Sequence, residues 1–197
     1  MITKMSPLLA VAVFASMTVS VGAQETTIHS RFNLSVASSA NMERIPPKQG
    51  LSDLDKQFLR SMAQVNIAEI QLGRLAQRSG STWGRGFGAD MVREHTILLE
   101  QLKEVAANAS FSLPTDADVA SQKAIAHLSL LGGVAFDESY RQLMIDGHRH
   151  VIGVVEDEIR DGHNSDIRGY AVTMETAVKL HMKLALQQTT MLGTKNG

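Results

Sequence analysis

The sequence predicts an all-α protein, an antiparallel four-helix bundle with a short extra helix between helices 2 and 3. Four long segments repeat apolar residues at intervals of three and four, as helices with one buried face do. Turn residues separate the first segment from the second and the third from the fourth, which makes each pair antiparallel neighbours. Aromatic residues make up only 5% of the 197 residues, and such a composition suits a helical bundle better than a β-sandwich.

The N-terminus has the pattern of a signal peptide over residues 1–23. Lys4 supplies a positive charge, Leu8 to Val21 is apolar, and small residues lead up to Ala23. The apolar run is shorter than the roughly 20 residues that span a bilayer, so we expect cleavage after Ala23 rather than a membrane anchor. The protein is therefore expected to be exported, to the periplasm, the outer membrane or the medium.

Three further segments follow the expected cleavage site. Residues 24–50 are rich in Ser, Asn and Thr and contain Pro46 and Pro47, which predicts a flexible linker. Residues 51–193 are expected to form the helical domain, and residues 194–197 a tail. No transmembrane span is expected in the mature chain.

The first two long helices are expected from about Ser52 to Gly80 and from Trp83 to about Ala109. Ser52 is a good N-cap, and Asp55 adds a favourable negative charge to the first turn. Gly80 suits the end of a helix, and Ser81 or Thr82 then caps the next one.

Three more helices are expected in the second half. Pro114 ends the preceding helix, and a short helix follows over about 116–131, which we expect to lie across one end of the bundle. The third and fourth long helices are expected over about 135–160 and 165–192, with a turn at 161–164 between them.

Each long helix carries one polar residue of a metal-ligand type on its apolar stripe, namely Glu69, His95, His148 and His181. At a rise of about 1.5 Å per residue, Glu69 and His95 lie within about 3 Å in height, and His95 and His148 share a level. His181 is offset from His148 by roughly 7 Å, so its place in the group depends most on the helix boundaries.

These four residues allow two interpretations. A carboxylate and three imidazoles could hold one divalent metal ion, zinc, manganese, iron or copper. Alternatively, Glu69 accepts hydrogen bonds from the histidines in a metal-free polar layer. Glu94 directly precedes His95 and is expected to point elsewhere, and Glu156 and Glu158 are expected on a solvated face.

Other observations limit the function classes. The chain has no cysteine, which excludes disulfides and thiolate metal sites, and its net charge of −1 gives no reason to expect a nucleic-acid partner. Peripheral association with the cell envelope stays open, and the oligomeric state is not indicated. We find no set of catalytic residues, such as a nucleophile placed beside a base.

The segments AEIQLGRLA, MVREH and AFDESY, followed by His148 and the late helix with His181, resemble a family of exported bacterial ferritin-like domains of unknown function, often labelled predicted outer-membrane proteins. The similarity extends over about 52–192. It implies a ferritin-like bundle and export but no reaction. Di-iron ferritins use Glu-x-x-His, and here Val92, Ile145 and Val178 stand three residues before the histidines, which argues against a di-iron centre.

Two functional hypotheses follow. The first is a non-catalytic exported helical protein with an envelope or stress-related role. The second is a mononuclear metal-binding or redox protein that uses the Glu69 and histidine layer.

Overall fold

The computed structural model describes residues 50–193, with side chains through residue 188. These residues form five helices: α1 Asp53–Ser79, α2 Thr82–Asn108, α3 Val119–Leu128, α4 Gly133–Asp161 and α5 Ser165–Gly193. The described range contains no β-strand, only an isolated bridge between Gly80 and Gly133. The predicted all-α class is therefore confirmed. The predicted signal peptide, all but the last residue of the predicted linker, and the tail lie outside the described residues.

Side-chain caps fix several helix ends near their predicted positions. Ser52 accepts a hydrogen bond from the Asp55 amide, and the Asp55 carboxylate accepts one from the Ser52 amide. This reciprocal pair satisfies amides that the first turn leaves free. Asp118 caps α3 by accepting from the Ala120 and Ser121 amides. The predicted helix at 116–131 is consequently shorter, because it begins only after this cap.

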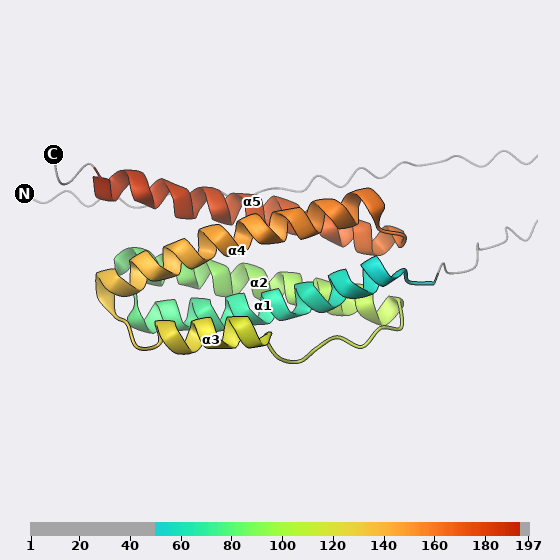
Figure 1. Ribbon diagram of the computed structural model, residues 1–197, viewed down its shortest axis with the longest axis horizontal. Helices are drawn as coiled ribbons and strands as arrows, with labels where there is room; N and C mark the ends of the chain where they lie inside the picture. Colours follow the sequence, from blue (N-terminus) through green and yellow to red (C-terminus); the bar gives the residue numbers. More distant parts are fainter. Residues whose placement is uncertain (1–49, 194–197) are drawn as a thin grey trace, which may run out of the picture. The chain divides into compact units, whose positions relative to one another are not determined.

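The four long helices pack side by side in antiparallel pairs (Figure 1). Helix α1 packs against α2 and α4, and α5 packs against α4 and α2. Helices α2 and α4 run in the same direction, so the connection between them returns along the length of the helices (Figure 1). The Gly80–Gly133 bridge brings the start of α4 beside the α1–α2 turn.

Helix α3 does not lie across one end, as the sequence analysis expected. It packs against α1 and α4 and runs alongside α1 (Figure 1). A helix of 27 residues such as α2 is about 40 Å long. The connecting segment must cover most of this length to reach the start of α4, and α3 forms part of that return path.

Two apolar clusters fill the interior on either side of a polar layer. One contains Phe58, Leu102 and Val155, and the other contains Phe87, Phe136 and Tyr140. Five buried polar residues fall between the residues of the two clusters, as the sets Met91–His95–Leu98, Met144–His148–Val151, Val178–His181–Ala185 and Ala63–Asn66–Glu69–Leu72 show. The long helices thus place their buried polar residues of the central layer at the same height along the helix axes.

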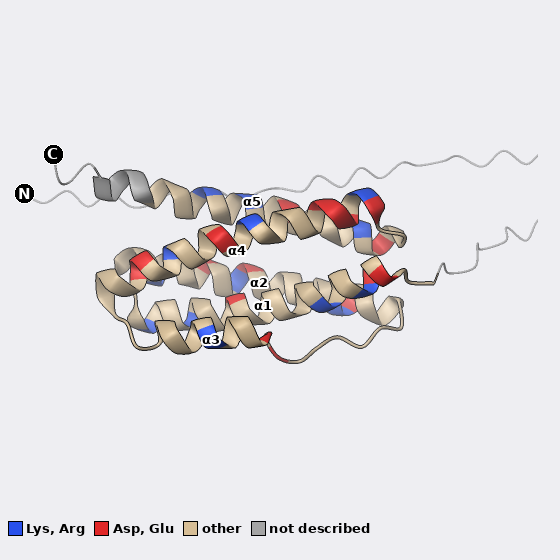
Figure 2. Cartoon of the chain, in the orientation of Figure 1, with Lys and Arg blue, Asp and Glu red and all other residues tan. Residues whose placement is uncertain are grey.

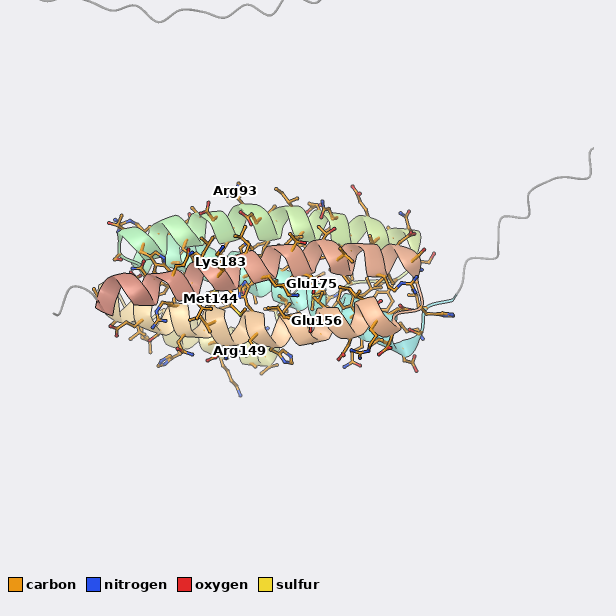
Figure 3. All side chains as sticks on the ribbon, turned by 90° about the horizontal axis from the view of Figure 1, so that it is seen from above. Arg93, Met144, Arg149, Glu156, Glu175 and Lys183 are labelled. Atoms are coloured by element: carbon orange, nitrogen blue, oxygen red, sulfur yellow. The ribbon has the colours of Figure 1, made fainter. Side chains whose placement is uncertain are left out.

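Charged residues of both signs are distributed over the long helices (Figure 2). At the seam of α4 and α5, Glu156 and Glu175 lie near each other (Figure 3), and Lys179 Nζ lies 3.2 Å from Glu156 Oε1 and 2.5 Å from Glu175 Oε1. Glu156 is exposed as predicted. Glu158 is fully buried, which corrects the prediction of a solvated face, because it follows Val155 by three residues on the buried stripe of α4.

Candidate metal centre

Three histidines from three helices meet in the polar layer. His95 of α2, His148 of α4 and His181 of α5 are each no more than 1% exposed. Ring nitrogens of the three residues lie within 4.8 Å of one another. The ring centroids are 5.2 Å apart for His95 and His181, 5.4 Å for His148 and His181, and 6.2 Å for His95 and His148.

His181 belongs fully to this group, although its estimated height made it the least certain member. Helix α4 extends to Asp161, one residue beyond its predicted end, which reduces the offset. Side chains on a helix also lean toward its N-terminus. Because α4 and α5 are antiparallel, the His148 and His181 side chains lean in opposite directions and approach each other.

The His95 ring is fixed by Asn66 of α1. His95 Nδ1 lies 2.9 Å from Asn66 Oδ1. The Asn66 amide nitrogen donates to the Met62 carbonyl and to the Tyr170 hydroxyl, so its oxygen faces His95 as an acceptor. His95 Nδ1 therefore carries the hydrogen, and the lone pair of the neutral ring is on Nε2.

The other two rings are fixed in the same way. His148 Nδ1 donates to the Met144 carbonyl at 2.8 Å, which leaves the lone pair on Nε2. His181 Nε2 donates to Glu94 Oε2 at 2.6 Å, which leaves the lone pair on Nδ1. Glu94 thus points at His181 across the α2–α5 interface, and the expectation that it points elsewhere is wrong. Neighbouring helix positions differ by about 100°, so residue 95 faces the interior and residue 94 faces α5.

One nitrogen of each ring is consequently buried without a hydrogen-bond partner: His95 Nε2, His148 Nε2 and His181 Nδ1. The rings cannot bond to one another, because each ring hydrogen is already donated to an acceptor outside the group. Leaving a buried acceptor unpaired costs about 1–3 kcal/mol. Three unpaired acceptors at one place are a donor set that a metal ion could bind.

Burial keeps two of these imidazoles, those of His95 and His148, neutral. Burial lowers the pKa of His95 well below its usual value, and the neighbouring histidines lower it further. Burial and His181 lower the pKa of His148 to about 3, against a weaker opposing effect of the Met144 carbonyl. Neutral imidazole is the form that binds metal ions, so a metal would meet little competition from protons at neutral pH.

The outer partners are those that metal-bound histidines use. Such histidines donate their second ring hydrogen to a carboxylate, a carbonyl or a similar acceptor, which fixes the ring orientation. Here an amide, a backbone carbonyl and a carboxylate take the three roles. Burial opposes ionisation of Glu94, but the hydrogen bond from His181 and the charge of Arg93 outweigh it and lower the pKa of Glu94.

Glu69 lies beside this group rather than within it. Its Oε1 is 3.9 Å from His148 Nδ1, the nitrogen that donates to Met144, and its Oε2 has no hydrogen-bond partner. Glu69 is 7% exposed, and burial raises its pKa to about 8. The structure thus brings the three predicted histidines together and places the predicted carboxylate next to one of them.

Sequence reasoning missed two residues of the centre, Asn66 and Glu94. Asn66 follows Met62 by four residues on the apolar stripe of α1, so a polar residue at a core position was a usable signal. Glu94 lies off the stripe, and only the packing of α5 on α2 reveals its role.

Comparison with known proteins identifies the family of the chain. A search of curated proteins and a search of solved structures each found no match. None of the helices in the described range is long and apolar enough to cross a membrane. The model of the domain of unknown function DUF4142 matches residues 40–187, which include every residue of the centre. The chain belongs to the DUF4142 family.

Proposed function

We propose that the protein binds one divalent transition metal ion through His95, His148 and His181. The observation that carries this proposal is the set of three buried ring nitrogens without partners, on rings whose other nitrogens are each held by an acceptor. Neutral rings in fixed orientations bind a metal with little reorganisation or proton loss.

The donor set favours particular ions among zinc, manganese, iron and copper. Imidazole suits zinc, copper and iron, whereas manganese prefers oxygen donors. Zinc–nitrogen bonds of about 2.0–2.1 Å in a tetrahedral site place the ligand nitrogens about 3.3 Å apart. The nitrogens lie within 4.8 Å of one another, so small side-chain movements would close the site around the ion. A fourth position would then be open to water or another ligand.

Glu69 has a supporting role in this proposal. A divalent ion brings positive charge into a buried layer, and the nearby carboxylate would offset part of it. Its contact with the Nδ1 side of His148 places this charge one residue away from the ion. A place for Glu69 in the coordination sphere itself would require its carboxylate to move past His148.

We further propose a ferritin-like four-helix bundle and an exported location. Support for the bundle comes from the antiparallel packing of α1 with α2 and α4, and of α5 with α4 and α2. Support for export comes from residues 1–23, which have the sequence pattern of a signal peptide. Mass spectrometry of the protein recovered from the cell envelope tests the second point, since cleavage after Ala23 leaves a chain that begins at Gln24.

Elemental analysis of protein purified from its own compartment tests the metal proposal. We expect one equivalent of metal per chain, or one equivalent after removal with a chelator and reconstitution with Zn²⁺. His148→Ala should abolish binding, and His150→Ala, at an exposed position on the same helix, should leave it intact. A folded protein that takes up no metal on reconstitution would contradict the proposal.

The thermal stability of the chelated protein separates this function from a metal-free one. A metal at about 100 times its Kd stabilises the fold by about 2.7 kcal/mol, so the melting temperature should rise on addition of Zn²⁺. The all-helical chain is also consistent with a non-catalytic helical protein that needs no metal. A melting temperature that changes neither with added metals nor with chelators would favour the metal-free, non-catalytic function.

One surface feature supports that second function. Ile97, Val172 and Leu180 are about half exposed and line a groove of about 500 Å³ between α2 and α5. Exposed apolar groups gathered in one groove are typical of contact surfaces. An interaction role in the envelope would use this groove, and a charged substitution such as Ile97→Glu should then weaken partner binding without changing the metal content.

A further inference from the structure

A separate cavity of about 400 Å³ lies between α1, α3 and α4. Its volume is within the usual range of about 300–1,000 Å³ for small-molecule pockets. Much of its wall is apolar, and the apolar side chains come from all three helices: Val65, Ala68, Leu72, Ala124, Leu143 and Val151. None of the three histidines of the metal centre lines it.

Glu69 is the ionisable group buried in the wall of this cavity. The residue is 7% exposed, and its Oε2 has no hydrogen-bond partner. The neighbouring His148 supplies none, because its Nδ1 donates to the Met144 carbonyl and is 3.9 Å from Glu69 Oε1. A buried carboxylate without a donor is costly, and a ligand with hydrogen-bond donors would remove this cost.

The other ionisable groups around the cavity also favour a cation. Asp118 at the rim accepts hydrogen bonds from the Ala120 and Ser121 amides and adds a second carboxylate. His150 lies at the exposed rim. Among the described residues that line the cavity there is no lysine or arginine to neutralise Glu69. A cation would favour the ionised form of Glu69 and pair with it, whereas an organic anion would find no lysine or arginine as a partner.

We propose that this cavity binds a small organic cation with a flat apolar body, whose amidinium, guanidinium or ammonium group donates to Glu69. Charge-assisted hydrogen bonds of this kind are about twice as strong as neutral ones. The apolar walls would contact the body of the ligand. The site goes beyond the metal proposal and does not depend on it.

Three probes of nearly the same shape test the charge preference: benzamidine is a cation, benzamide is neutral and benzoate is an anion. Binding to the full chain is measured by calorimetry and by NMR titration, with and without Zn²⁺. We expect benzamidine to bind at least about tenfold more tightly than benzamide, which corresponds to about 1.4 kcal/mol, and benzoate to bind least. Equal binding of the three probes, or no binding of benzamidine, would overturn the proposal.

Variants locate the site. Glu69→Gln should remove the preference for benzamidine over benzamide, and Glu156→Gln, on the exposed face of α4, should preserve it. Ala124→Phe keeps Glu69 but fills the cavity from α3, and it should abolish binding of benzamidine and benzamide alike. Retained benzamidine affinity in a folded Glu69→Gln or Ala124→Phe protein would contradict this location. If Glu69→Gln does not fold, the binding of benzamidine to Ala124→Phe decides whether the ligand occupies this cavity.

The two proposals fail in different ways. Ala124→Phe leaves His95, His148, His181 and Glu69 in place, so the variant should still take up one metal ion. A protein that binds Zn²⁺ but not benzamidine would overturn the cavity proposal alone. A protein that binds benzamidine but no metal would overturn the metal proposal alone.

Discussion

Glu158 of α4 offers a direct test of the electrostatics of the buried interior. It has no exposed surface, and burial together with Asp55 raises its pKa to about 8. Asp55 itself is held ionised by hydrogen bonds from Ser52 and from the amides of His163 and Asn164. Glu158→Gln keeps the size of the side chain and removes its titration, so the variant isolates this one group.

The sign of the effect follows from the two pKa values of Glu158. The ordinary value is 4.5 and the folded value is about 8, so the folded protein holds the proton more tightly than the unfolded chain. The stabilisation is complete below pH 4.5 and is lost as the pH rises through 8. Linkage over the interval from pH 5 to pH 7 gives a loss of stability of about 2–3 kcal/mol, which the variant should not show.

Urea denaturation of the chelated full chain at pH 5, 6 and 7 measures this loss. We expect the stability of Glu158→Gln relative to wild type to increase by about 2–3 kcal/mol between pH 5 and pH 7. Glu156→Gln is the matched control, because Glu156 is exposed on the same helix, and it should follow the wild-type curve. Parallel curves for wild type and Glu158→Gln would refute the reasoning.

Three further predictions concern the metal centre and the helix packing. Glu94→Ala removes the acceptor of the His181 hydrogen bond and should weaken zinc binding about 10–100-fold. Glu100→Ala, on the exposed face of α2, should leave zinc binding unchanged. Competition with a chromogenic chelator measures both affinities. Between pH 7 and pH 5, the free energy of unfolding of the chelated protein should fall by about 2 kcal/mol less in His148→Gln than in wild type. A histidine whose folded pKa is about 3 stabilises the fold above pH 6.5, and this stabilisation is lost as the pH falls from 6.5 toward 3. Gly73→Ala would place a Cβ 2.6 Å from the Gly88 carbonyl oxygen and should destabilise the fold by about 1–3 kcal/mol. Gly153 has open space around it, so Gly153→Ala should stabilise the fold by about 0.5–1 kcal/mol. Urea denaturation measures both changes.

The helical class and the level of the polar layer were predictable because both depend on local rules. The capping pair of Ser52 and Asp55 marks the start of α1, and the stripes of apolar residues select the buried face of each helix. A histidine on such a stripe must be buried wherever the helix packs. His95, His148 and His181 therefore meet in the structure although the sequence separates them by many residues.

The remaining features depend on how the helices pack, which no single stripe determines. The path of α3 follows from the parallel directions of α2 and α4, and this direction is a property of the whole connection. Glu94 lies off the buried stripe of α2, and only the packing of α5 against α2 brings it to His181. Glu158 lies on the buried stripe of α4, and the packing of the helices places it near Asp55 of α1.

Under the proposed function, the lone pairs and carboxylates of the polar layer favour a divalent ion over protons. Protonating one of the three rings would add a single charge and leave two buried lone pairs still unpaired. A divalent ion would engage all three lone pairs at once, and two carboxylates stand close enough to offset its charge. Glu94 contacts His181 at 2.6 Å, and Glu69 lies 3.9 Å from His148. Burial raises the pKa of Glu69 to about 8, and the ion would favour its ionised form, so that both carboxylates would offset the charge of the ion, as buried charges require.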